Sequence, residues 1–142
     1  MPSPRKKRPF QLSVLCLLFF IYAIFCFSRV YQTWQQRQEL LEISKNNIFL
    51  LWYFISIGLL IGSVSVWVGV SLWRGQKKAR TMTLVFYFAA FSIFIIEKFI
   101  SWAYLGNVQR NILFLLLLWL LFFFLGWSIL KSSSVDDFLS VE

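Results

Sequence analysis

Uncharged apolar runs dominate the chain, and they are much longer than the alternating stretches typical of half-buried strands. Three runs cover residues 9–28, 46–73 and 111–130, and a fourth covers 81–96 and resumes at 99 after one acidic–basic pair. A helix of about 20 apolar residues crosses the ~30 Å hydrocarbon core of a bilayer. The pattern therefore predicts four membrane-spanning helices, near 10–29, 48–73, 82–105 and 111–130.

The amino-acid composition agrees with this pattern. The 142 residues are 59% hydrophobic and 20% aromatic, and only 14% are charged. A water-soluble domain of this size has too much surface to bury so many large apolar side chains, and a disordered chain would contain few of them. We therefore predict an all-α fold, an integral membrane four-helix bundle. Its single domain covers 10–130, between a basic cytoplasmic tail at 1–9 and a flexible cytoplasmic tail at 131–142.

The connection between the first two spans has a pattern of its own. Residues 30–43 place apolar side chains at roughly helical spacing among Gln and charged residues. This pattern favours a short interfacial helix at the outer surface, continuing from the first span, with Trp34 as an anchor among the lipid headgroups. A plain polar connection is the alternative.

Basic residues are divided unequally between the two sides of the predicted bundle. The side with both termini carries Arg5, Lys6, Lys7, Arg8, Arg74, Lys77, Lys78, Arg80 and Lys131. The other side carries Arg29, Arg37, Lys45 and Arg110. Because cytoplasmic segments carry the excess of Lys and Arg, we predict a multi-pass plasma-membrane protein with both termini in the cytoplasm. The net charge of +8 then reflects topology and contact with anionic lipid headgroups, not binding of nucleic acid.

The sequence offers few groups for catalysis or for metal binding. It contains no histidine, which is the commonest metal ligand and general base, and it has no glycine-rich phosphate-binding loop. Cys16 and Cys26 would lie ~15 Å apart along one helix, which is too far for a disulfide between them. We therefore expect no cofactor, no metal and no enzymatic activity.

Small residues recur along one face of the second span. Gly58, Gly62, Ser65 and Gly69 are separated by steps of three or four residues, so they form one stripe on a helix. Small side chains let a neighbouring helix approach closely in a membrane. We expect this small-residue stripe to pack against another helix, and we favour one from the same chain over one from another protein.

The third span places most of its polar atoms on one face, which includes Glu97 and Ser101. Glu97 should therefore point into the bundle, while Lys98 should point towards lipid and extend to the outer headgroups. A carboxylate inside a membrane must be paired or protonated, and the nearest candidate partner is Arg29, expected at the end of the first span. We interpret Glu97, Arg29 and Ser101 as an intramembrane polar site. The fourth span is apolar on every face and should face lipid.

Several short motifs give the chain a resemblance to known proteins. Lys7-Arg8-Pro9 opens the first span, Arg29 follows it, Leu72-Trp73-Arg74-Gly75 ends the second span before Ala79, and Glu97-Lys98 lies late in the third. In these features the chain resembles a group of small four-span bacterial membrane proteins that have no established activity. The resemblance implies four spans and a bacterial source, and it implies no ligand, partner or reaction.

These features favour a non-enzymatic accessory subunit or scaffold of a larger membrane complex or homo-oligomer. The alternative is a small homo-oligomeric ion- or proton-coupled transporter that uses Glu97. A lipid-modifying enzyme would need a reactive cluster at the bilayer surface. Glu39 and Glu42 beside Arg37 are the available candidates, and their pattern is typical of a solvated helix face.

Overall fold

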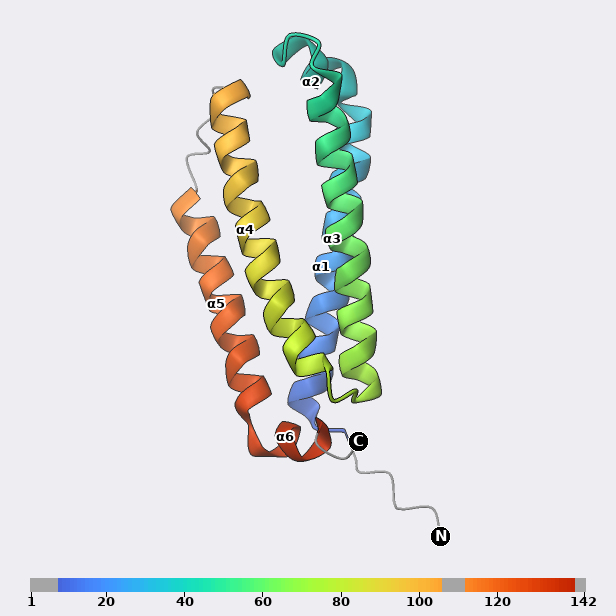
Figure 1. Cartoon of the computed structure of the whole chain (residues 1–142), viewed down its shortest axis with the longest axis vertical. Helices are drawn as coiled ribbons and strands as arrows, with labels where there is room; N and C mark the ends of the chain where they lie inside the picture. The colour runs from blue at the N-terminus through green and yellow to red at the C-terminus, as the bar shows by residue number, and fades with distance from the viewer. Residues whose placement is uncertain (1–7, 106–111, 140–142) are drawn as a thin grey trace.

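The computed structural model describes residues 8–105 and 112–139, and all regular structure within these two ranges is helical. The helices are α1 (Phe10–Gln35), α2 (Arg37–Ile43), α3 (Ile48–Arg74), α4 (Ala79–Leu105), α5 (Ile112–Lys131) and α6 (Ser133–Leu139). The four long helices α1, α3, α4 and α5 run along the length of the molecule (Figure 1). The short helices α2 and α6 lie at opposite ends, and α1 begins and α5 ends at the α6 end (Figure 1).

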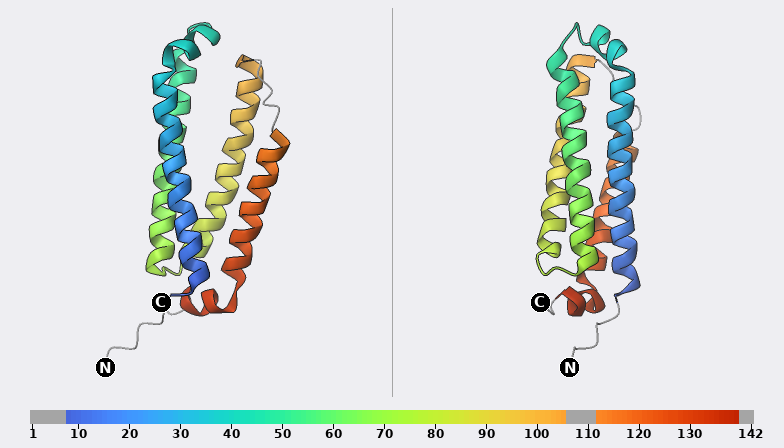
Figure 2. Two further views of the ribbon diagram at one scale, coloured as in Figure 1. Left: turned by 180° about the vertical axis from the view of Figure 1, so that it is seen from behind. Right: turned by 90° about the vertical axis from the view of Figure 1, so that its right-hand side faces the viewer.

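Four helices are long and apolar enough to cross a membrane, which confirms the predicted all-α bundle of four candidate spans. The right-hand view of Figure 2 shows α1 and α3 side by side along their lengths, with α4 behind α3 and α5 behind α1. The α4–α5 pair lies closest to α1 and α3 near the α6 end and diverges from them towards the α2 end (Figures 1 and 2). The connection between α4 and α5, with Arg110, lies outside the described residues.

The first span is longer than the sequence suggested, and Arg29 lies inside α1 rather than at its end. Residues 30–35 contain no glycine or proline to stop the helix, and the Thr33 hydroxyl donates to the Arg29 carbonyl at 2.9 Å within the same helix. The helix breaks at Gln36, and α2 follows immediately. The helix predicted over 30–43 is therefore present as the last part of α1 and all of α2.

The small-residue stripe lies against α1, within the same chain. A Cβ added at Gly58 would lie 2.5 Å from Cγ2 of Val30, and one at Gly62 would lie 2.8 Å from the Phe27 ring. Between these glycines and the α6 end, the Ser65 hydroxyl donates to the Phe19 carbonyl at 2.9 Å. These contacts leave no space for larger side chains, so the stripe explains why α1 and α3 stay side by side.

Aromatic rings join this helix pair to α4 and α5. Phe19 of α1 is fully buried, and its ring centroid lies 5.3 Å from Phe86, 5.8 Å from Tyr87 and 6.1 Å from Phe122. Most of these rings meet edge to face or tilted, which is the favoured geometry for aromatic pairs. The aromatic cluster thus joins α1 to α4 and α5.

The tail after α5 was expected to be flexible, and the structure corrects this expectation for residues 133–139, which form α6. Val135 and Leu139 are buried, and the ring of Phe138 lies over Gly75 at the turn after α3. Arg80 forms an ion pair with Asp136 at 2.8 Å and also donates to the Leu130 carbonyl. Apolar residues at helical spacing and one ion pair therefore hold α6 across the end of the bundle.

Candidate functional site

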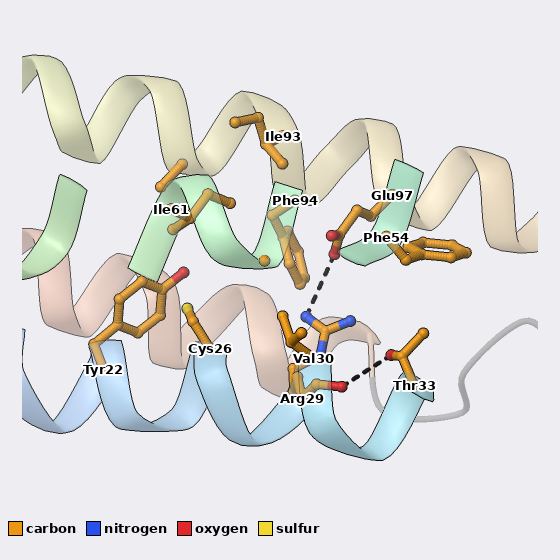
Figure 3. Close-up of a pocket in the computed structure, with 12 residues that line it drawn as sticks. Tyr22, Cys26, Arg29, Val30, Thr33, Phe54, Ile61, Ile93, Phe94 and Glu97 are labelled. Carbon is orange, nitrogen blue, oxygen red and sulfur yellow. Dashed lines mark hydrogen bonds and ion pairs between the residues drawn. The ribbon is translucent and has the colours of Figure 1, made fainter. Parts of the chain in front are cut away.

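An arginine and a glutamate face each other across the bundle in its α2 half. Nη1 of Arg29 on α1 lies 3.4 Å from Oε2 of Glu97 on α4, as the dashed line in Figure 3 shows. The Glu97 side chain is only 10% exposed, whereas that of Arg29 is 52% exposed. The expected partners are thus brought together, and the half-exposed arginine offsets the cost of holding a carboxylate among apolar side chains.

Both residues lie far from the α6 end of the molecule. The helical rise of ~1.5 Å per residue places Arg29 about 28 Å from Phe10 and Glu97 about 26 Å from Arg80. A hydrocarbon core is ~30 Å thick, so in a bilayer the pair lies near the boundary remote from the termini. This depth lowers the energetic cost of the charges, because Arg29 can reach the headgroup region.

A small cavity surrounds the pair, with walls from α1, α3 and α4. Its volume is about 50 Å³, enough for a few water molecules. Thr33 and Phe54 line it on one side of the pair, and Tyr22 and Ile61 line it on the side nearer the bundle centre (Figure 3). The cavity is large enough to hydrate Glu97 but too small for an organic solute.

The interior between this cavity and the α6 end is mainly apolar. The buried polar and charged side chains among the described residues are Ser44, Ser65, Ser71, Thr83 and Glu97. Thr83 satisfies its hydroxyl within its own helix, at 2.7 Å from the Ala79 carbonyl. The aromatic cluster around Phe19 lies between Glu97 and the α6 end, and the buried hydroxyl of Ser65 in this region donates to a backbone carbonyl.

Two other residues of α4, Ser101 and Lys98, do not lie where the helical spacing predicts them. Ser101 is half-buried on α4 and does not line the cavity around the pair. Lys98, which was expected to point towards lipid, is also half-buried, with Nζ 5.4 Å from the centre of the Phe94 ring. The structure turns Lys98 towards α5, so it shares the surface beside Arg29.

The basic residues at the α6 end divide into two groups. Arg8 donates to the Trp73 carbonyl at 2.5 Å and stacks 3.7 Å above the Trp73 ring, and Arg80 holds α6. Arg74, Lys77 and Lys78 are exposed beside them. Arg5, Lys6 and Lys7 lie outside the described residues. Two of the residues interpreted as topological signals are thus also structural, because they close the ends of α3 and α5.

The contact between Tyr87 and Gly126 was not found by sequence reasoning. Tyr87 is 1% exposed, its hydroxyl has no hydrogen-bond partner, and a Cβ at Gly126 would overlap that hydroxyl. The sequence does contain an indication of this contact, because Gly126 is the one glycine in the otherwise bulky apolar run of 111–130. A lone glycine in such a run indicates a close approach, so part of this span packs inward instead of facing lipid.

Within residues 8–105 and 112–139, no group of three or more His, Cys, Asp or Glu side chains is arranged to hold a metal ion. Cys16 and Cys26 are free thiols, both buried. The fold and the site together define the class of protein: a helical bundle with four candidate membrane spans, in which a buried glutamate pairs with a half-exposed arginine. No protein family, curated protein or solved structure matches the chain.

Proposed function

We propose that this chain is a multi-pass protein of a bacterial plasma membrane, with both termini in the cytoplasm. In this orientation the α6 end, with its exposed Arg74, Lys77 and Lys78, faces the cytoplasm, and the Arg29–Glu97 pair lies near the outer surface. The bacterial source rests on the resemblance of the sequence motifs, and the orientation rests on the distribution of basic residues.

Within that membrane we propose a non-enzymatic role, as an accessory subunit or scaffold of a larger membrane complex. The observation that carries this proposal is the mainly apolar interior, with its cluster of aromatic rings, between Glu97 and the α6 end. A transported ion needs polar groups along its whole path, because each unsatisfied charge in a bilayer costs several kcal/mol. Here aromatic rings occupy that position, and α6 covers the end of the bundle.

The Arg29–Glu97 pair then has a structural role. It links α1 to α4 in the half of the bundle where α4 and α5 diverge from α1 and α3 (Figure 1). A polar contact between two spans fixes their register. Lipid tails can replace the apolar side chains of a neighbouring helix, but they cannot replace a charged partner. The outer faces of the spans remain free for lipid or for the helices of a partner.

Purification from native membranes in a mild detergent, followed by native mass spectrometry, tests this proposal. We expect a second membrane protein, or further copies of this chain, at a fixed stoichiometry. Glu97→Gln should leave that assembly largely intact, because an ion pair with a half-exposed arginine contributes only about 1 kcal/mol. Glu97-dependent transport by the purified chain in proteoliposomes, whether it is monomeric or oligomeric, would contradict the scaffold role.

One observation favours the transporter alternative: a cavity of about 50 Å³ surrounds a buried glutamate. In coupled transport, a membrane carboxylate can release its arginine partner and bind a proton in its place. This alternative requires the aromatic cluster to open. Proton-coupled uptake that is lost in Glu97→Gln, but retained in Ser101→Ala with both variants folded, would establish it over the scaffold role.

A further inference from the structure

A second, larger cavity lies on the other side of Arg29. It has a volume of about 470 Å³ and lies between α1, α4 and α5 in the same half of the bundle as Glu97. Its walls are mainly apolar and include Leu115, Trp119 and Phe122, while Phe25 (59% exposed) and Leu118 (47% exposed) lie at its rim. The cavity is therefore a groove that opens towards the surrounding bilayer.

Two cationic side chains line this apolar groove, Arg29 and Lys98. Glu97 compensates one of the two charges through its contact with Nη1 of Arg29. A guanidinium carries five N–H donors, so Arg29 retains donors for a second acceptor while it contacts Glu97. The groove thus combines apolar walls with a net positive charge at the depth of the outer hydrocarbon boundary.

From this combination, we propose that the groove between α1, α4 and α5 binds an anionic phospholipid. Its phosphate would lie between Arg29 and Lys98, and one acyl chain would lie along Leu115, Trp119 and Phe122. The proposal goes beyond the scaffold role and does not depend on it.

The position and chemistry of the groove favour a lipid over a soluble anion. The groove opens sideways to the bilayer, and its volume lies within the range of ligand-binding cavities. Arginine and lysine are the side chains that recognise phosphate, and their long apolar stems allow both to reach the headgroup level. A water-soluble anion would leave the apolar walls unfilled, whereas a phospholipid contacts walls and cations together.

Native mass spectrometry of the full chain, released from detergent with added lipid, tests the proposal. The probes are phosphatidylglycerol and phosphatidylcholine with identical acyl chains, so that only the headgroup charge differs. We expect one retained phosphatidylglycerol with an affinity about fivefold higher than that of phosphatidylcholine, since one basic residue near a membrane surface contributes about that factor. Equal retention of the two lipids would overturn the proposal.

Two pairs of variants make the test specific to the groove. Lys98→Gln should abolish the preference for phosphatidylglycerol. Arg37→Gln removes the same charge from the exposed α2 helix and should retain the preference.

Leu118→Trp keeps both cations but fills the groove, so it should lower the retention of phosphatidylglycerol. Leu60→Trp, on the far face of α3, is its control. Thermal unfolding of each variant checks the fold. Equal losses in Lys98→Gln and Arg37→Gln would show unspecific charge attraction and overturn the site.

Discussion

The hydroxyl of Tyr87 on α4 lies directly against the backbone of Gly126 on α5, and it has no hydrogen-bond partner. This contact joins the last span to the aromatic cluster, because the Tyr87 ring also lies 5.2 Å from that of Phe122. The absence of a side chain at position 126 is what allows the large phenol ring to occupy the space between the two helices.

The first prediction follows from this contact. Gly126→Ala should destabilise the bundle by about 1–3 kcal/mol, because the new methyl group overlaps the buried hydroxyl of Tyr87. Tyr87→Phe should cost little or be stabilising, since it removes a buried hydroxyl that makes no hydrogen bond. Thermal unfolding in detergent, followed by tryptophan fluorescence, measures both effects.

The double variant is the decisive control for this contact. If Tyr87→Phe removes the overlapping atom, it should recover part of the stability that Gly126→Ala loses. Independent, additive effects of the two substitutions would show that α4 and α5 do not meet at these residues.

The second prediction concerns the Arg29–Glu97 pair. The free energies of unfolding of Glu97→Gln, Arg29→Gln and the double variant form a double-mutant cycle, for which we expect a coupling of about 1 kcal/mol. The value is modest because Arg29 is half-exposed and the N–O distance is 3.4 Å. Arg37→Gln replaces Arg29→Gln in the control cycle and should show no coupling. A coupling below about 0.5 kcal/mol in the main cycle would remove the pair as a stabilising contact.

The third prediction tests the small-residue stripe. Gly62→Leu should destabilise the fold strongly, because even a Cβ at this position comes within 2.8 Å of the Phe27 ring on α1. Leu60→Ala removes a side chain that is 60% exposed on the other face of α3, and it should cost much less. Equal unfolding temperatures of the two variants in detergent would contradict the packing of α1 on α3 through Gly62.

The spans, the stripe and the inward direction of Glu97 could all be predicted because they depend on local periodicity. A step of four residues places Gly58 and Gly62 on one face, whereas the ~100° rotation between consecutive residues places Glu97 and Lys98 on different faces of α4. Arg29 was found as the partner of Glu97 because few cations occur at that depth. These arguments need only the helical repeat and the thickness of a bilayer.

The remaining features depend on how the helices are placed against one another, which periodicity does not determine. Lys98 faces the groove because α5 lies beside that face of α4, and nothing near Lys98 in the sequence indicates this neighbour. In the tail, Val135 and Leu139 are too few to predict a stable helix by themselves. They become ordered because Gly75 leaves space for Phe138 and because Arg80 attracts Asp136.

The fourth prediction concerns the docking of α6. Val135→Asp places a charge at a fully buried position and should release α6 from the bundle. Ser134→Asp introduces the same side chain at the neighbouring exposed position and should leave α6 in place. Backbone amide hydrogen exchange in residues 133–139 should therefore become fast in the first variant alone. Fast exchange in the unmodified protein would show that α6 is not docked.

The last prediction concerns the orientation of the bundle in the membrane. Gln76 lies in the turn after α3 at the α6 end, and Gln38 lies in α2 at the opposite end. With the native Cys16 and Cys26 replaced by alanine, we introduce Gln38→Cys or Gln76→Cys and label intact cells with a membrane-impermeant maleimide. The nine-to-four distribution of basic residues predicts labelling at position 38 and none at position 76.

Permeabilised cells provide the control, because both positions should then react equally if both are exposed to water. The reverse result in intact cells, with strong labelling at position 76, would place the α6 end outside the cell. The Arg29–Glu97 pair and the lipid-binding groove would then belong to the cytoplasmic leaflet, and the balance of Lys and Arg would not have set the topology. Labelling of neither position in intact cells would equally contradict the assigned orientation, because it leaves Gln38 inaccessible from outside.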